Sequence, residues 1–279
     1  MASLLRRLPP IAVASFVLGI ASGCSGRPTY PKEQLVESLR TLLAQDQLHL
    51  TAARLVDRTF AAQLDHPGTI SDTQGQIGLG PAFDDAVRKA ITTIHRVLMS
   101  TDARVEFYVL LITDPAVPGI YITLVRYLDD VRRAYWNSLS STEMFARTIF
   151  DLHYVGSEPP TLEQYVPKEI QLEEFLSWQL ARRIQSKLIE SLEPSGGISV
   201  GRCGGEFRDG EFVFTLDVAP VANDTFDEDK IRTLLNTSTT VIAEVLSSYQ
   251  FESFNAVRLI HPQTGRNLVL PKARLELFK

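Results

Sequence analysis

The stretch TTIHRVLMSTDARVEFYVLLI, residues 92–112, decides the fold, because within it a helical pattern of apolar residues changes to a run typical of a buried strand. The stretch TVIAEVLSSYQFESFNAVRLI, residues 240–260, aligns with it without a gap. Eight of the 21 aligned residues are identical, from Thr92 and Thr240 to Ile112 and Ile260. Repetition at a fixed offset, here 148 residues, indicates two similar structural units.

On both sides of these stretches, the apolar periodicity and the turn residues predict the remaining helices and strands. Helices are expected at residues 31–43, 81–98, 129–151, 169–192 and 225–246. Strands are expected at residues 48–56, 59–64, 105–113, 120–127, 198–203, 211–218, 251–260 and 268–277. Residues 65–80, which are rich in glycine and proline, are expected to form a loop.

The predicted fold class is α+β, with two tandem two-layer sandwich domains. Each domain reads helix–strand–strand twice, and its antiparallel sheet has one face covered by two amphipathic helices. We expect residues 31–156 to form the first domain, 157–168 a linker broken by Pro159 and Pro160, and 169–279 the second domain. The other face of each sheet should be solvated or open to a partner, and the edge strands could accept another strand.

The first residues have the three parts of a secretory signal. Arg6 and Arg7 precede an apolar run at residues 11–20, and small residues follow at 21–23. The run is about half of the roughly 20 residues that a membrane-spanning helix needs. We therefore expect residues 1–23 to be a removable signal.

The stretch Ile20-Ala-Ser-Gly-Cys24 resembles the lipobox of bacterial lipoproteins. That resemblance implies cleavage after Gly23, a diacylglycerol on the Cys24 thiol and an acyl chain such as palmitate on its amine, so that residues 24–30 form a lipidated tether. Ser25, where an aspartate would signal retention, favours the outer membrane, facing the periplasm, in a bacterium with two membranes. The alternative is an ordinary signal peptidase site that leaves Cys24 unmodified. The rest of the chain is similar only to uncharacterised bacterial lipoproteins, which implies no activity.

Composition limits the possible partners. Of the 28 basic residues Arg6 and Arg7 fall in the expected signal, so 26 would face 33 acidic residues in the mature chain, a net charge of about −7. This balance does not suit nucleic acid, which needs a clustered basic face. With Cys24 lipidated, Cys203 is the single remaining thiol, so the sequence predicts no internal disulfide and a small buried side chain at Cys203.

The residues that could carry chemistry do not assemble into a recognisable motif. None of the five histidines lies three or four residues from another, so we expect no helical metal pair, no metal and no cofactor. The Asp129-Asp130 pair followed by Arg132-Arg133 is best explained as a solvated helix start that complements the helix dipole. No catalytic residue is predicted.

The richest aromatic segment comprises Tyr135, Trp136, Phe145, Phe150 and Tyr154. Such side chains suit either packing between the two domains or contact with a partner protein. Tyr135, Trp136, Phe145 and Phe150 are the possible partner-contact residues. Trp178 lies off the main apolar stripe of its helix and is a further contact residue to consider.

These features favour a lipid-anchored envelope protein that acts as a non-enzymatic binding or scaffold module for a protein complex. The membrane, through Cys24, and another envelope protein are the expected partners. An alternative is a carrier of a small molecule or lipid in the groove between the domains, which needs an apolar cavity of about 300 Å³ or more. A third possibility, an enzyme without a recognisable motif, would need titratable residues that converge in a cleft.

Overall fold

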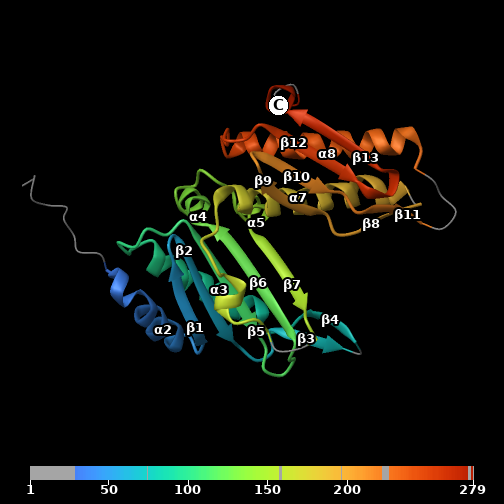
Figure 1. Ribbon diagram of the computed structural model, residues 1–279. Coiled ribbons are helices and arrows are strands. Elements are labelled where there is room, and N and C mark those ends of the chain that lie inside the picture. The colour runs from blue at the N-terminus through green and yellow to red at the C-terminus, as the bar shows by residue number, and fades with distance from the viewer. Residues whose placement is uncertain are drawn as a thin grey trace, which may run out of the picture.

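The computed structural model describes residues 29–73, 75–156, 159–195, 197–221, 226–275 and 278. The expected signal peptide, the lipobox and Cys24 lie outside the described residues. The fold is mixed α+β, with a five-stranded sheet, a four-stranded sheet and two small two-stranded sheets (Figure 1).

The five-stranded sheet is formed by the first half of the chain and has the order β1-β2-β5-β6-β7. In chain order, its elements are η1 (Lys32–Gln34), α2 (Leu35–Gln45), β1 (His49–Val56), β2 (Thr59–Asp65), α3 (Phe83–Leu98), β5 (Phe107–Thr113), β6 (Ile120–Tyr127), α4 (Leu128–Tyr135), α5 (Ser141–Ala146) and β7 (Ile149–Tyr154). The predicted loop at 65–80 instead contains a hairpin of β3 (Ile70–Thr73) and β4 (Gln76–Leu79).

The four-stranded sheet is formed by the second half and has the order β13-β12-β10-β9. Its elements are α7 (Leu172–Leu192), β9 (Gly204–Arg208), β10 (Glu211–Thr215), α8 (Glu228–Ser248), β12 (Ala256–His261) and β13 (Arg266–Pro271). Shorter elements are α6 (Leu162–Tyr165), η2 (Glu193–Ser195), η3 (Pro262–Thr264) and α9 (Lys272–Leu275), and β8 (Ile198–Val200) pairs with β11 (Val218–Pro220).

The prediction that both sheets are antiparallel is wrong at their centres. Strand β2 runs parallel to β5, and β10 runs parallel to β12. The reason is that a long helix, α3 or α8, connects the two inner strands, and a crossover of that length returns the chain to the same end of the sheet. Each sheet therefore contains two hairpins joined side by side through a parallel pair, and β7 extends the five-stranded sheet beyond β6. The stretches at 92–112 and 240–260 both cover the end of this helix and the strand that follows it.

The predicted helix at 129–151 is also wrong, because the segment divides into α4, α5 and the edge strand β7. Asn137 adopts a left-handed conformation, with φ of 54°, directly after α4. Ser140 then caps α5 by accepting a hydrogen bond from the Glu143 backbone at 3.1 Å. The chain turns back at Thr148, and β7 pairs antiparallel with β6 from Ile149 onward.

The five-stranded sheet is covered on both faces, so the expectation of an open second face is wrong for this sheet. Helices α2 and α3 pack on one face, and α6, residues 166–170 and the start of α7 pack on the other. The rings of Phe107 on β5 and Phe175 on α7 lie 5.3 Å apart across this second contact. All seven residues of β5 are buried, as in strands that lie between two layers.

Helix α7 contributes to both halves of the molecule. Leu176, Leu180 and Ile184 pack into the core over the four-stranded sheet. Phe175, on another side of the helix, packs into the cluster on the far face of the five-stranded sheet. The two halves are therefore held together by apolar contacts on either side of one helix.

A buried polar network also joins the halves. Asp130 on α4 binds Arg147, with 2.7 Å between Oδ1 and Nη1, and accepts a hydrogen bond from the Tyr249 hydroxyl at 2.6 Å. Gln179 on α7 donates to the same hydroxyl at 2.9 Å, and the Arg147 guanidinium lies over the Tyr249 ring. Asp130 was expected at a solvated helix start, but it is buried because this network surrounds it.

Candidate functional site

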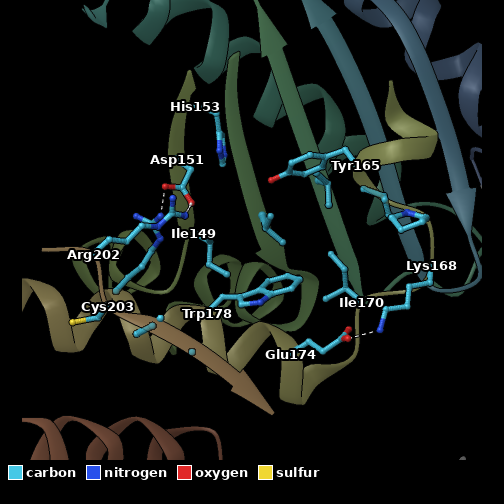
Figure 2. A pocket seen from close by; sticks show the side chains of 18 of the residues that line it. Ile149, Asp151, His153, Tyr165, Lys168, Ile170, Glu174, Trp178, Arg202 and Cys203 are labelled. Carbon is cyan, nitrogen blue, oxygen red and sulfur yellow. Dashed lines mark hydrogen bonds and ion pairs between the residues drawn. The ribbon is translucent and has the colours of Figure 1, made fainter. Parts of the chain in front are cut away.

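A pocket of about 480 Å³ lies where the far face of the five-stranded sheet meets α7 (Figure 2). The sheet contributes Val109, Val125 and Ile149, from β5, β6 and β7. Residues 165–170 form one side and α7 another, and the segment 202–205, which leads into β9, closes the end. Both halves of the chain thus contribute to its walls.

Helix α7 presents one stripe to the pocket. Its lining residues are Glu174, Trp178, Ala181, Arg182 and Gln185. They recur at intervals of three and four, so a helix with 3.6 residues per turn places them on one side. This stripe differs from the leucine-rich stripe that enters the second core, which leaves α7 free to line a cavity while it stays anchored.

Gly205 allows β9 to approach α7. A Cβ atom added at Gly205 would lie 2.2 Å from the backbone oxygen of Ser177, so another residue would push the helix away. Cys203, which precedes the glycines, is buried as expected, and burial raises the pKa of its thiol to about 11. The thiol is therefore protonated near neutral pH and is a poor nucleophile.

The side formed by residues 165–170 is held in place by hydrogen bonds and an ion pair at its two ends. Thr161 and Gln164 cap the short helix α6 through reciprocal side-chain bonds. At the other end the Ile170 backbone donates to the Thr59 hydroxyl at 2.8 Å in a buried contact, and Glu169 forms an ion pair with Arg58. The linker expected at 157–168 therefore includes a helical turn, and residues 165–168 line the pocket.

One end of the pocket is polar and carries more positive than negative charge. Asp151 on β7 forms an ion pair with Arg182, and Arg202 lies 3.8 Å from the same carboxylate. His153 stacks on Tyr121 with ring centroids 4.6 Å apart, and burial lowers its pKa, which favours the neutral ring. Two guanidinium groups therefore share one carboxylate here.

The other end holds a second ion pair and the centre is apolar. Lys168 binds Glu174 at the foot of α7, and Ile149, Ile170 and Trp178 point into the space between the two polar ends (Figure 2). Trp178 is partly exposed, so its ring faces open space in the pocket. The arrangement suits an apolar molecule that carries an acidic group at one end.

The aromatic residues selected from the sequence lie elsewhere. Trp136, Phe145 and Tyr135 are 76%, 72% and 59% exposed, so they do not pack between the halves. Phe150 is half-buried, with its ring 5.7 Å from that of Phe83 in an edge-on contact. None of these four residues lines the pocket, although Trp178, noted as a further contact residue, does.

Sequence reasoning missed most of the pocket. A signal was present in β5, because Phe107–Ile112 is apolar at every position, a pattern that indicates a strand covered on both faces. A second signal was the Glu174–Gln185 stripe, which mixes charged and aromatic residues at helical spacing. Asp151 and Arg202 carried no sequence signal, since they meet only through the packing of β7 against the segment before β9.

Two features are absent from the residues that the structure describes. Within them, no three His, Cys, Asp or Glu side chains are grouped as a metal site requires. No helix in the described part of the chain is both long and apolar enough to span a bilayer. No model of a known family, no curated protein and no solved structure matches the chain significantly.

Proposed function

We propose that this protein is a lipid-anchored cell-envelope protein that binds, without catalysing a reaction, a small apolar ligand bearing an acidic group. The observation that carries the proposal is the pocket of about 480 Å³ with an apolar centre and an arginine-rich end. Its volume falls within the roughly 300–1,000 Å³ typical of small-molecule sites. The carrier is thereby preferred over the scaffold that the sequence alone favours.

The anchor belongs to the same proposal. Residues 1–23 serve as the signal, lipid on Cys24 holds the protein to the membrane, and the outer membrane facing the periplasm is the expected location in a bacterium with two membranes. Support comes from Arg6, Arg7, the apolar run and the lipobox at Ile20–Cys24. Two or three acyl chains hold a protein far more firmly than one, because each buried methylene contributes about 0.8 kcal/mol.

We further propose that residues 31–156 and 169–279 are tandem domains of duplicated origin. Their support is the common element order, the inner parallel strand pair in each sheet and the matching stretches at 92–112 and 240–260. The pocket lies where these two units meet, which is a preferred place for ligand sites.

Arg202 is the residue best placed to receive the acidic group. Its side chain is well exposed, and the carboxylate nearest to it, Asp151, is already held by Arg182. A ligand carboxylate or sulfonate could use two guanidinium N–H groups at once, a geometry that lysine lacks. The apolar part would then extend past Ile149 toward Trp178 and Ile170.

Binding without catalysis is the simpler reading of the ionisable groups. The carboxylates of Asp151 and Glu174 are each occupied by a cation, and the Cys203 thiol is kept protonated by burial. The neutral His153 ring lies 2.9 Å from the Thr123 hydroxyl and stacks on Tyr121. These contacts hold the ionisable groups in place, so we propose that the pocket binds its ligand through shape and charge complementarity.

The test uses Trp178, one of the two tryptophans of the chain, as the fluorescence donor. In a Trp136→Phe variant the remaining Trp178 should transfer excitation energy to anilinonaphthalene sulfonate, an apolar anionic probe, with saturable binding. Arg202→Gln should weaken that binding about 1.5- to fivefold, since an exposed ion pair contributes roughly 0.2–1 kcal/mol. Arg208→Gln, an exposed arginine on β9 outside the pocket lining, is the matched control and should leave binding unchanged.

The neutral probe N-phenylnaphthylamine separates the contribution of charge to binding affinity from that of shape. Arg202→Gln should not change its affinity, because it has no acidic group to lose. If neither probe shows saturable binding, the carrier proposal is overturned. Membrane fractionation of Cys24→Ala and the mass of the amino-terminal peptide test the anchor independently of the pocket.

A protein partner is the second candidate function, and one observation favours it. Strand β7 is an edge of the five-stranded sheet and exposes Leu152 and Tyr154, which alternate with the pocket residues Asp151 and His153 and so lie on the opposite face of the strand. An extended segment of another envelope protein could add to this edge through backbone hydrogen bonds. In-cell photo-crosslinking from position 152 would capture that protein in the anchored form and lose it in Cys24→Ala.

A further inference from the structure

Three exposed aromatic side chains that lie outside the apolar cores and the pocket are close together in the sequence. Tyr135 and Trp136 stand at the end of α4, and Phe145 lies on the adjoining helix α5. Single exposed apolar residues are common, but three aromatic rings within eleven residues on neighbouring short helices need an explanation. These three residues are called the aromatic tip below.

The chemistry of the aromatic tip suits the boundary between lipid and water. Tyrosine and tryptophan combine an apolar ring with a polar O–H or N–H, and they concentrate where membranes meet water. Arg132 and Arg133, on the same turn of α4, are partly exposed. Arginines beside such rings can lay their apolar stems along the acyl chains and keep the charged group among the headgroups.

The place where the chain enters the body lies at the same end of α3 as Tyr135. The Tyr30 backbone donates to the carbonyl oxygen of Ser100 at 3.2 Å, and Tyr30 forms an isolated parallel bridge with Thr101. The ring of Tyr135 lies 6.1 Å from that of His95, which is about one helical turn before Ser100. The tether and the aromatic tip therefore share the carboxyl-terminal end of α3.

The length of the tether then limits what can cover this end. Five residues separate Cys24 from Tyr30, and a fully extended chain of that length reaches about 20 Å. A small folded domain is about 30 Å across. Once Cys24 is anchored, the space between the bilayer and the aromatic tip is too narrow for such a domain. The aromatic tip itself lies close enough to the bilayer to reach the lipid headgroups.

We propose that the aromatic tip, Tyr135, Trp136 and Phe145, rests in the headgroup region of the bilayer that carries the lipid on Cys24. The inference rests on the proposed anchor and is independent of the pocket. The contact fixes the orientation of the body on the membrane. It would hold Tyr154, at the end of β7, away from the bilayer, because Tyr154 pairs with Ile120 at the start of β6 and α4 follows the other end of that strand.

The test is depth-dependent quenching with the full-length, lipidated protein reconstituted in vesicles of phosphatidylcholine with brominated acyl chains. Trp178→Phe leaves Trp136 as the one tryptophan. Its emission should be quenched about twofold or more relative to non-brominated vesicles, since interfacial side chains insert roughly 5–10 Å. Trp136→Phe, which leaves the pocket tryptophan Trp178, should show little quenching.

A second control separates insertion from mere nearness to the tether. Tyr154→Trp, in a background of Trp136→Phe and Trp178→Phe, moves the reporter to an exposed site at the opposite end of β6, about 25 Å away. This reporter should escape quenching although the same lipid holds the protein. Equal quenching at positions 136 and 154 would overturn the inference.

The remaining outcomes distinguish this inference from the anchor. A lipidated amino-terminal peptide together with an unquenched Trp136 would overturn the membrane contact and leave the anchor intact. An unmodified amino-terminal peptide would overturn both. Loss of a co-purified protein in Trp136→Ala, with no quenching in the parent, would overturn the membrane contact and assign the aromatic tip to a protein partner.

Discussion

The carboxylate of Asp130 and the guanidinium of Arg147 form an ion pair of 2.7 Å with side chains only 2% and 3% exposed. Removing one member of such a buried pair leaves the other charged and without compensation. We expect Asp130→Asn to lower the free energy of unfolding by about 3–5 kcal/mol. Urea unfolding followed by circular dichroism measures the change.

Asp129→Asn is the matched control for that prediction. Asp129 lies beside Asp130 in the sequence, but its carboxylate is exposed and stands 4.0 Å from Arg132. We expect this variant to remain within about 0.5 kcal/mol of the parent. Equal effects of the two substitutions would contradict a special role for the buried pair.

The hydroxyl of Tyr249 should contribute less to the free energy of unfolding than the Asp130–Arg147 ion pair, but more than a surface hydroxyl. It donates to Asp130 and accepts from Gln179, so Tyr249→Phe leaves two buried polar groups each without one partner. We expect a loss of about 1–3 kcal/mol in unfolding free energy. Tyr154→Phe, which alters an exposed tyrosine, should have almost no effect in the same assay.

His95 should make the protein sensitive to acid. Burial, with a smaller contribution from Arg126, lowers its pKa from 6.5 to about 3, so the folded state keeps the ring neutral where the unfolded state binds a proton. Stability contributed by this residue is complete above pH 6.5 and is lost as the pH falls toward 3, by about 1.4 kcal/mol per pH unit. His95→Gln should flatten the pH dependence of the unfolding midpoint between pH 6 and 4. Parallel curves for parent and variant would show that the histidine does not titrate in this way.

Gly205 should tolerate no side chain. Because a Cβ there would lie 2.2 Å from the Ser177 backbone oxygen, Gly205→Ala must displace α7 from β9, and we expect a loss of about 1–3 kcal/mol. Gly204→Ala is the control, since its Cβ would meet only the Thr215 side chain at 3.9 Å. Thermal unfolding of the two variants tests the difference. A smaller loss for Gly205→Ala than for Gly204→Ala would disprove the close packing.

Cys203 should react slowly in the folded protein. Its thiol is buried and its pKa is about 11, so at pH 8 the thiolate is roughly a hundredfold scarcer than in the unfolded chain. In a Cys24→Ala background, Ellman's reagent should label position 203 only after urea is added. Rapid labelling of the native protein would mean that the segment before β9 opens readily.

Much of the fold could be predicted from local pattern. The amphipathic helices around Ile94 and Ile242 follow from periodicity and are present. The strand expected at 198–203 is wrong beyond Val200, because β8 ends there and pairs with β11, and β9 at Gly204–Arg208 is the strand that pairs with β10. The parallel pairing of β2 with β5 was missed, although a helix between two strands favours a parallel crossover, because which strands become neighbours depends on how that helix lies over the sheet. No local pattern records that choice.

The missed strand β7 and the pocket have a common cause. Ile149–Tyr154 alternates only weakly, and its place at the sheet edge is decided by β6 and by the cap at Ser140. The pocket needs α7, β7 and the segment before β9 to meet, and these lie up to about 55 residues apart in the sequence. Asp130 was misread for the same reason, since its partners Arg147 and Tyr249 lie 17 and 119 residues away in the sequence.

Helix α7 has a consequence for any attempt to divide the chain. Phe175 on one side and Leu180 on another are buried by different sheets, so a fragment that ends before α7 would expose Phe107, and one that begins at α7 would expose Phe175. Each half would carry a bare apolar face prone to aggregation. We therefore expect the two halves to unfold cooperatively in a single transition, and limited proteolysis near residue 157 to yield a nicked but still associated molecule rather than two autonomous fragments.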